Sequence, residues 1–559
     1  MNRWRKWRRR LLWLAGGFVT AMLVLWGTMT ALMMRWAAKP PQLVEEPAIT
    51  RLAPEWRGDR VYLGRNWFGR REGLPVLYLT GTPFEMGYAN GALTQTLIHR
   101  QEDTILQLFT RVAPYRWTQF LLKFLVTCRN RHLAEHVTPE LQMEMFGLAR
   151  GCPDTHPEMG PCFNRILNYH SAQDISYMMI HNPLIRPGCT SFGAWGPRTR
   201  DGHLMSGRNF DWEAAPVFDE DRIIIFCKPD AGIPFISLAW AGMAGCVSGL
   251  NREGVSVSVN GAPSRLPAAA GTPTCLVARE LLQHAHNLAE ATEIIRRRQV
   301  FVSALFLVGS RVDGRFVVVE KTPERMAVRE PAQSEDTIVC ANHYLTPDLK
   351  DDPINAEFKR VDTSVSRFER MTELLRESGR SLDAERTAMV LRDRRLPGGR
   401  LAGNGHRGSL NPLIATHAVI MDVTAGLFWA AAPPHQLGKF VAFDLNDLEK
   451  LLPEATVAAD PMLAGGEYER YLAAKVGLAE GWRSLKGGDL DRALHRAQAA
   501  EANNPGFYAN AWLLAEVRFQ QGKYAEAAQA CRQAMEGIPA LAGERRRIGQ
   551  LLDQAAMHQ

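Results

Sequence analysis

Short apolar runs separated by turn residues fill the middle of this 559-residue chain. After residue 188 these runs are rich in β-branched residues and are bounded by turns such as Pro229–Gly232 and Asn251–Gly254, a pattern typical of strands. The predicted strands are Arg222–Cys227, Pro234–Trp240, Val255–Val259, Ser303–Val308, Phe316–Val319, Thr416–Met421 and Leu427–Ala431. Helical patterns interrupt them at about Thr272–Arg298, Val361–Ser378 and Asp383–Asp393. Strands in two groups around a helical layer predict an α+β fold whose sheets are covered by helices.

The pattern before residue 188 is different. Val61–Leu79 predicts short strands, and apolar positions at helical spacing then dominate to about Ile180. Thr82 and Pro83 stand where an N-cap and a first helical turn accept them. The clearest helical segments here are Thr104–Val112, Trp117–Val126 and Pro139–Arg150.

A basic cluster and a long uncharged run open the chain. Met1–Arg10 holds six Lys or Arg residues, and Leu11–Met34 carries no charge over 24 residues, enough to cross a bilayer as a helix. Arg35–Lys39 is a poor cleavage site, which predicts an uncleaved anchor. The basic side should stay in the cytoplasm and the catalytic part outside it, in a bacterial periplasm. A buried core helix, or twin-arginine export through Arg8–Arg10, are the alternatives.

Composition narrows the function classes. Hydrophobic residues make up 46% and charged residues 22%, an ordinary globular balance. The formal charge is +7, and most of that excess lies in the N-terminal cluster, so no nucleic-acid partner is expected. The nine cysteines form no metal-binding or disulfide pattern, although Cys152 and Cys162 could close a small loop. We expect no cofactor and no metal.

The chain from about Glu467 repeats itself. Gly488–Ala493 is echoed 34 residues later by Gly522–Ala527, and Pro505 and Pro539 are separated by the same interval. This period resembles the paired helices of tetratricopeptide repeats. Only about two repeats fit, so we expect them to pack on the preceding domain or on each other in a dimer, with a possible protein partner.

Cys189 is the candidate nucleophile. A thiol attacks as thiolate and needs a base, yet no histidine near Cys189 in the sequence is an obvious partner. Cleavage of the Gly188–Cys189 peptide would free an α-amine, whose ordinary pKa is about 7.7–8.0 and which could take the thiol proton. Gly188 could adopt a strained backbone that assists attack on its own carbonyl.

Three stretches carry a family resemblance. Cys189-Thr190-Ser191, the Asp201-Gly202 turn and Gly207–Asp211 resemble the N-terminal-nucleophile (Ntn) hydrolases. Within these they are similar to the linear-amide branch, which includes choloylglycine hydrolases, acid ceramidase-like amidases and acyl-coenzyme A:6-aminopenicillanic acid acyltransferases. The resemblance covers roughly residues 61–445, and the long segment before the cysteine favours the acyltransferase-like branch. It implies a four-layer αββα sandwich and autoproteolysis at Gly188–Cys189. It also implies hydrolysis, or acyl transfer, of a small linear acyl amide.

The resemblance also implies roles for other residues. Arg208 would stabilise the thiolate or orient substrate, and Asp211 would hold the α-ammonium. Asn260 is the candidate for binding the oxyanion, Asn342 matches a second asparagine, and Arg367 matches the last polar member of the site. Each also has a structural interpretation, as an ion pair, a turn residue or a surface charge.

Two other functions are open at this point. His132–His136 fits the HxxEH pattern of zinc peptidases if both histidines lie on one helical face, although a polar helix face is the simpler interpretation. A membrane-tethered binding protein with an inactive catalytic domain is the other. The predicted division is 1–38 basic segment and anchor, 39–60 linker, 61–188 mostly helical pro-segment, 189–445 catalytic core, 446–466 linker and 467–559 helical repeats.

Overall fold

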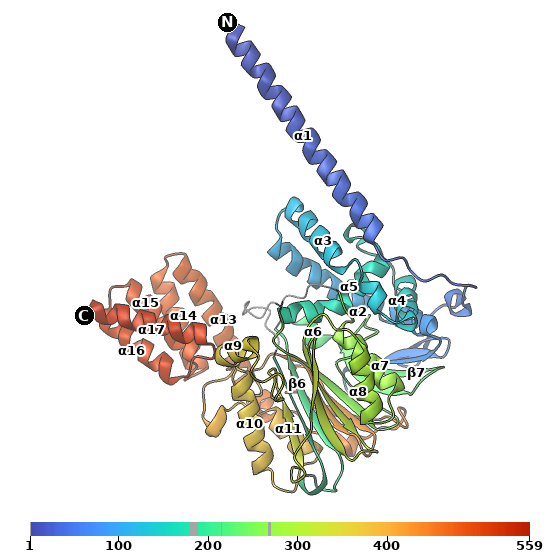
Figure 1. Cartoon of the computed structure of the whole chain (residues 1–559). Coiled ribbons are helices and arrows are strands. Elements are labelled where there is room, and N and C mark those ends of the chain that lie inside the picture. Colours follow the sequence, from blue (N-terminus) through green and yellow to red (C-terminus); the bar gives the residue numbers. More distant parts are fainter. Residues whose placement is uncertain (1, 179–187, 214, 266–269, 559) are drawn as a thin grey trace.

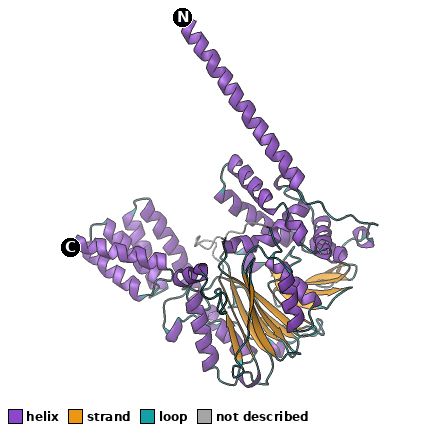
Figure 2. Ribbon diagram, viewed as in Figure 1, coloured by secondary structure: helices purple, strands orange, loops and turns teal. Residues whose placement is uncertain are grey.

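The computed structural model describes residues 2–178, 188–213, 215–265 and 270–558. Helix α1 projects from a body of packed helices and strands, and a separate group of helices lies at the C-terminal end (Figure 1). The strands gather in the middle of that body and helices flank them (Figure 2). The predicted mixture of helices and strands in one α+β fold is confirmed.

The strands form two sheets. The larger has eleven strands, in the spatial order β1 (Glu55–Arg57), β2 (Arg60–Leu63), β3 (Asn66–Arg71), β4 (Leu74–Gly81), β7 (Arg222–Pro229), β8 (Phe235–Trp240), β9 (Ser248–Asn251), β10 (Val255–Gly261), β11 (Ala304–Ser310), β12 (Arg315–Lys321) and β13 (Met326–Arg329). The smaller has six, in the order β14 (Thr337–Cys340), β5 (Gly188–Ala194), β6 (Met205–Asp211), β15 (Ala415–Asp422), β16 (Leu427–Ala431) and β17 (Phe440–Asp444). The pair β4–β7 is parallel and the other pairs are antiparallel. A parallel pair needs a long crossover, and here the helical segment before β5 is part of that crossover.

Helices cover the outer faces of both sheets. The helices are α1 (Asn2–Trp36), α2 (Pro83–Val112), α3 (Arg116–Asn130), α4 (Pro139–Gly151), α5 (Cys162–Met178), α6 (Val217–Glu220), α7 (Thr274–His284), α8 (Leu288–Arg297), α9 (Pro353–Val361), α10 (Ser364–Glu377), α11 (Ala384–Leu391), α12 (Pro461–Ala464), α13 (Glu467–Lys486), α14 (Leu490–Asn503), α15 (Tyr508–Gln520), α16 (Tyr524–Glu536) and α17 (Ala542–Met557).

Three hydrophobic clusters define how these elements pack. One joins α2, α7 and α8 to the larger sheet. A second lies between the two sheets, where Leu305 of the larger and Val419 of the smaller are both fully buried. A third joins the smaller sheet to α10 and α11. Figure 1 accordingly shows α7 and α8 on one side of the strands and α10 and α11 on the other.

Two helical predictions need correction. Thr272–Arg298 is two helices rather than one, because the Asn287 side chain accepts the backbone N–H of Glu290 at 2.9 Å and caps α8. Val361 ends α9, and α10 begins three residues later at Ser364. The Thr82 cap and Pro83 in the first turn of α2 are confirmed. The predicted helical pattern reaches Ile180, which lies outside the described residues.

The two ends of the chain are helical. Among the described residues one helix, Arg10–Trp36, is long and apolar enough to cross a membrane; none of its residues is buried, and its C-terminal part contacts α3. At the other end α13 to α17 pack in sequence as antiparallel neighbours. Gly488 and Gly522 both adopt left-handed backbone, at φ 81° and 73°, and each lies two residues before the start of α14 or α16. This turn conformation accounts for the glycines of the 34-residue echo.

Candidate active site

Cys189 lies at the start of β5, between β14 and β6, and its side chain is fully buried. It pairs with Phe210 of β6, and Ser191 pairs with Arg208. Because alternate residues of a strand share a face, Cys189 and Arg208 project from the same side of the sheet. The Arg208 Nη2 lies 3.6 Å from the Cys189 Sγ.

The Arg208 guanidinium is held rigidly. Its Nη1 donates to Ser248 Oγ at 2.7 Å, its Nη2 donates to the Val259 carbonyl, and its charge lies 4.8 Å over the Phe210 ring. In the described part of the chain no carboxylate forms an ion pair with it. A buried cation without a carboxylate partner favours an anion beside it, and the thiolate of Cys189 is well placed to be that anion.

Two residues hold the backbone of Cys189. The Asn342 Oδ1 accepts the Cys189 N–H at 2.9 Å and also accepts Arg367 Nη2 at 2.8 Å. Arg367 Nη1 donates to the Cys189 carbonyl and, at 2.7 Å, to Thr190 Oγ1. Asn342 lies two residues after the end of β14 and Arg367 lies in the first turn of α10, so two separate segments fix the nitrogen and the carbonyl of one residue.

Asp211 lies beside the peptide before Cys189. It pairs with Gly188 across the β5–β6 ladder. Burial raises its pKa to about 7, against the opposing charges of Arg367, Arg407 and Arg208. A Cβ at Gly188 would lie 3.5 Å from Asp211 Oδ2 and from the Arg367 guanidinium, an ordinary contact. Gly188 is therefore not required by crowding, and its place in an extended strand gives no support to the strained backbone predicted for it.

Asn260 is brought near the site, where it contacts Ser191 of the same strand as Cys189. It lies on β10 of the larger sheet, and its Nδ2 donates to Ser191 Oγ at 3.1 Å and to the carbonyls of Cys340 and Ala341 at 3.0 and 3.1 Å. In the uncleaved chain, the N–H groups of the Asn260 amide therefore already donate to these three acceptors. The oxyanion-binding role of Asn260 stays a prediction.

The structure adds His417 and Arg407 to the neighbourhood. The His417 Nε2 lies 3.4 Å from Arg208 Nη1, and complete burial together with the nearby Arg208 and Arg222 charges lowers its pKa well below the ordinary value. A neutral histidine therefore faces Arg208. The polar position within the apolar strand β15 was a signal for His417, whereas the loop position of Arg407 gave none.

The HxxEH prediction is wrong in its geometry. His132–His136 is not part of an α-helix, because α3 ends at Asn130 and Leu133–His136 is a short 3₁₀ helix. With about three residues per turn, positions four apart do not share a face. His132 instead pairs with the exposed Glu135, Nδ1 to Oε1 at 2.7 Å.

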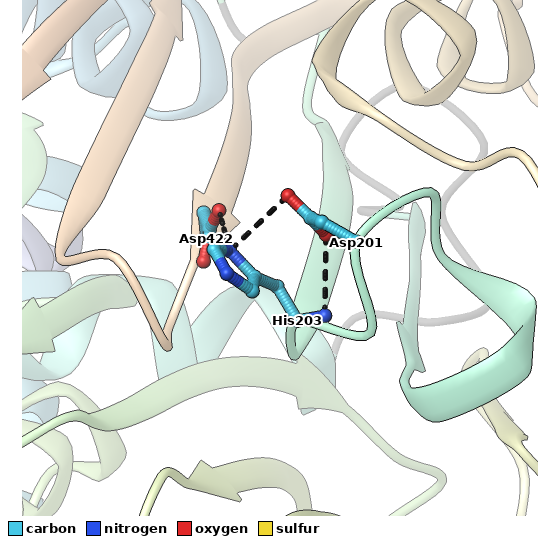
Figure 3. A group of neighbouring side chains, drawn as sticks. All are labelled: Asp201, His203 and Asp422. Carbon is cyan, nitrogen blue, oxygen red and sulfur yellow. Dashed lines mark hydrogen bonds and ion pairs between the residues drawn. The ribbon is translucent and has the colours of Figure 1, made fainter.

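A cluster of one histidine and two aspartates lies at the turn of the β5–β6 hairpin, at the opposite end from Cys189. Asp201, His203 and Asp422 point toward one another there (Figure 3). The His203 Nδ1 lies 2.8 Å from Asp422 Oδ2 and 3.3 Å from Asp201 Oδ2. Both carboxylates thus share one ring nitrogen, an arrangement that ties the turn to β15.

An apolar cavity lies in the helical layer near the site. Its volume is about 120 Å³, and Trp212, Phe218 and Trp240 form part of its lining. Phe218 and Trp240 belong to the same hydrophobic cluster as Cys189. All nine cysteines are described and none forms a disulfide, so the Cys152–Cys162 loop is not closed.

Comparison with known proteins gives one family match. Residues 198–397 match the family described as acyl-coenzyme A:6-aminopenicillanic acid acyl-transferase. The matched segment is a little over a third of the chain; it starts after Cys189 and contains the other five candidate site residues. The match supports the predicted resemblance to the Ntn hydrolases and, in general terms, an enzyme of amide hydrolysis or acyl transfer.

Curated relatives match parts of the chain. An uncharacterized protein of Archaeoglobus fulgidus is 26% identical over 349 residues, which cover 56% of this chain and 56% of the relative. Protein dcd1B of Dictyostelium discoideum is 26% identical over 236 residues, 39% of this chain and 44% of the relative. Protein dcd1A of the same organism is 25% identical over 282 residues, which cover 45% of this chain and 59% of the relative. The chain spans about half the length of these relatives.

Solved structures give weaker likenesses. The Caenorhabditis elegans ortholog of N-acylethanolamine-hydrolyzing acid amidase aligns with a TM-score of 0.31 and 17% identity, over 42% of this chain and 93% of that chain. A mutant of conjugated bile acid hydrolase from Clostridium perfringens aligns with a TM-score of 0.33 and 13% identity, over 47% of this chain and 95% of that chain.

Proposed function

We propose that this chain is a self-processing cysteine enzyme of the Ntn-hydrolase class that hydrolyses a linear amide, or transfers its acyl group, through a Cys189 acyl-enzyme. The observation that carries the proposal is the buried Arg208 guanidinium beside the Cys189 Sγ, at 3.6 Å. In this proposal the helix, sheet, sheet and helix packing is the αββα sandwich of the class, and α13 to α16 are tetratricopeptide-like hairpins.

Self-cleavage would begin at the Gly188 carbonyl. The Cys189 Sγ attacks that carbon, the C–S bond forms, the C–N bond breaks and the released amine takes up a proton. Water then hydrolyses the thioester and leaves Gly188 with a carboxylate. Arg208 stabilises the attacking thiolate, and the buried Asp211 carboxyl lies beside Gly188, where it can exchange a proton with the departing amine.

Turnover of a substrate would repeat these steps on another amide. The new α-amine of Cys189 takes the thiol proton, because nucleophile and base then belong to one residue. Asn342 and Arg367 hold the backbone of Cys189, and Asp211 holds the α-ammonium. Water resolves the acyl-enzyme in a hydrolase, and a second amine resolves it in an acyltransferase.

The place of action follows from α1. We infer that α1 anchors the chain in a membrane with residues 1–10 in the cytoplasm, so the catalytic part lies on the outer side. Coenzyme A is not expected there, which favours hydrolysis over transfer. Alkaline carbonate extraction of membranes tests the anchor: the full chain should stay in the pellet, and release into the supernatant would contradict it.

Intact mass and N-terminal sequencing of the purified protein test the chemistry. We expect two chains, the second beginning at Cys189 and ending at Gln559. Cys189→Ala should stay uncut. Cys227→Ala, which removes another fully buried strand cysteine, should be cut as in the wild type. An uncut wild-type chain, or cleavage that persists in Cys189→Ala, would contradict the proposal.

A further inference from the structure

Helix α3 carries an apolar stripe that the described part of the chain leaves uncovered. Trp117 is 68% exposed, Leu121 41% and Leu125 53%, and their spacing of four residues places them along one face of the helix. Val112, at the end of α2, and Tyr115, just before α3, are exposed as well. Exposed apolar side chains gathered in this way indicate a surface that binds something apolar.

The stripe belongs to a helix that lies beside α1. The centroids of the Trp26 and Phe120 rings are 6.0 Å apart, and those of the Trp36 and Phe124 rings are 6.2 Å apart. Both contacts use the C-terminal half of α1, which is the half nearer the body, and α3 lies next to that half (Figure 1). Side chains of α1, α3 and α5 line a groove of about 710 Å³ between these helices.

Both helices are fastened to α5. The Asn164 side chain of α5 exchanges two hydrogen bonds with the backbone of Ala38, which lies two residues after the end of α1. The Asn164 Oδ1 accepts the Ala38 N–H at 2.7 Å, and the Asn164 Nδ2 donates to the Ala38 carbonyl at 2.9 Å. At the end of α3, the Asn130 Nδ2 donates to the Asn168 Oδ1 of α5 at 2.5 Å. A chain that enters a bilayer through α1 therefore carries α3 with it.

The position of Trp26 in α1 gives the depth of α3. Trp26 lies eight residues before Met34, where the uncharged run ends, and this interval is about 12 Å along a helix. When α1 spans a hydrocarbon layer about 30 Å thick, Trp26 lies among the acyl chains of the outer leaflet. Phe120 packs on Trp26, so the part of α3 that carries the apolar stripe lies at the same level.

The charges around the stripe suit a bilayer surface. Residues 104–134 contain no Asp or Glu and hold five Lys or Arg residues. Arg111 and Arg116 are exposed on either side of the turn before α3. Long cationic side chains can keep their charge at the level of the lipid phosphates while the apolar positions lie deeper, whereas a carboxylate at that depth would be costly.

We propose that α3 and the turn before it form a second membrane-embedded element, which lies in the outer leaflet beside α1. Lipid acyl chains cover the α3 stripe and fill the groove between the helices, and lipid phosphates meet Arg111 and Arg116. The inference rests on the membrane anchor of the proposed function. A single spanning helix leaves the body free to turn about the helix axis, and a second embedded helix fixes which face of the body rests on the membrane.

Photolabelling from within the bilayer tests this placement. The full-length protein is reconstituted into vesicles of phosphatidylcholine with a minor share of phosphatidylglycerol, and a phosphatidylcholine with an aryl diazirine at the end of one acyl chain is included. After irradiation, tryptic peptides are analysed by mass spectrometry. We expect label on Leu11–Arg35 of α1 and on Trp117–Lys123 of α3. Val476–Arg483 of α13, which contains the exposed Val476, should stay unlabelled.

A charge placed in the stripe should move α3 out of the acyl-chain region. Leu121→Glu should lower the label on Trp117–Lys123, relative to Leu11–Arg35, about ten-fold or more. Met389→Glu, at an exposed position of α11, should leave that ratio as in the wild type. Thermal unfolding shows whether each variant is folded, and Trp117→Glu, at a more exposed position of the stripe, decides if Leu121→Glu is not.

The outcomes separate this inference from the proposals on which it rests. Both peptides precede Cys189, so the result does not depend on self-cleavage. An unlabelled Leu11–Arg35 contradicts the anchor and this inference with it. Label on Leu11–Arg35 with none on Trp117–Lys123 contradicts this inference alone. If mass photometry of the protein in nanodiscs then finds a dimer that Leu121→Glu separates, the stripe belongs to an interface with a second copy of the chain.

Discussion

At the scale of single residues, the main feature of the site is the positive charge beside the candidate nucleophile, Cys189. Arg208 is buried, fixed by Ser248 and the Val259 carbonyl, and lies 3.6 Å from the Cys189 sulfur. The sequence identified Arg208 only through resemblance, because an Arg three residues before an Asp is most often part of a structural ion pair. Burial on the face that Cys189 shares changes that interpretation.

We predict that Arg208→Met slows self-cleavage by about 10²–10³-fold, the usual effect of removing one preorganised charge donor. The rate of appearance of the chain that begins at Cys189 measures this. Arg208→Lys should recover part of the rate. Arg200→Met, in the exposed turn at the other end of the hairpin, should behave as the wild type. Equal rates for Arg208→Met and the wild type would remove Arg208 from the mechanism.

Asp211 should make the stability of the folded chain depend on pH. Its folded pKa is raised to about 7 from 3.8, so between these pH values the folded chain keeps a proton that the unfolded chain has released. Stability therefore falls as pH rises through this window. Asp211→Asn should remove that part of the slope, so the variant gains on the wild type from pH 5 to pH 8 in thermal unfolding. Asp59→Asn, at the exposed turn between β1 and β2, is the control, and parallel profiles for Asp211→Asn and the wild type would refute the prediction.

At the scale of elements, the β5–β6 hairpin carries the candidate nucleophile at one end and a histidine ion pair at the other. Cys189 and Asp211 lie at the open end, where β5 begins and β6 ends. His203 lies at the turn and is tied to Asp422 of β15 (Figure 3). The turn contact fixes the hairpin on β15 and so helps to set the register in which Cys189 faces Phe210.

The His203 contact should be visible as a pH effect. Partial burial would lower the pKa of His203, but the hydrogen bond to Asp422 raises it overall. The stabilisation is complete below about pH 6.5 and is lost as pH rises through the folded pKa. His203→Asn should lower stability by up to about 1 kcal/mol at pH 5.5 and by less at pH 8. His495→Asn, on the exposed face of α14, should show no such trend, and an equal loss at both pH values would contradict the prediction.

Element boundaries show where periodicity stops being informative. The strands with alternating or continuous apolar runs, such as β7, β10 and β15, were predicted within a few residues. The short strands β9 and β14 were not, because these four-residue strands, buried throughout in β9 and at three positions in β14, carry no alternation. The break between α7 and α8 depends on a single Asn cap, which an apolar pattern does not register.

At the scale of the whole molecule, the C-terminal helices and the core behave as one body around residues 403–406. Gly405 has left-handed backbone, at φ 86°, and packs on Tyr471. Gly488 is left-handed too, at φ 81°, but nothing lies within 4 Å of where its Cβ would be. A comparison of substitutions at Gly405 and Gly488 therefore separates the free-energy cost of backbone strain from the free-energy cost of a clash in the interface.

We predict that Gly405→Ala destabilises the docked state by about 1–3 kcal/mol more than Gly488→Ala, because only the first also forces a clash in a packed interface. Limited proteolysis within residues 446–466 and α13 to α17 measures the loss of docking. It should be faster in Gly405→Ala alone. Equal protease sensitivity in the two variants would show that the helices are not locked in this way.

The sequence by itself determined the local features of this protein. The uncharged run from Leu11 to Met34, the strands and most helices, the 34-residue echo and the cysteine of interest can all be read from neighbours along the chain. These features depend on periodicity, turn chemistry and short motifs, which act over a few residues. Resemblance to a family then supplied five further residues, but not their distances.

Only the tertiary structure decided which of these residues meet. Arg208, Asn342 and Arg367 come from β6, the end of β14 and α10, and hydrogen bonds spanning up to 178 positions bring them to Cys189. It also directed the Asn260 amide to Ser191 and to the Cys340 and Ala341 carbonyls, and it made the HxxEH segment a 3₁₀ turn. It joined the C-terminal helices to the core at residues 403–406. Such contacts depend on how layers pack, and no pattern of local hydrophobicity encodes which distant side chains a packed layer brings together.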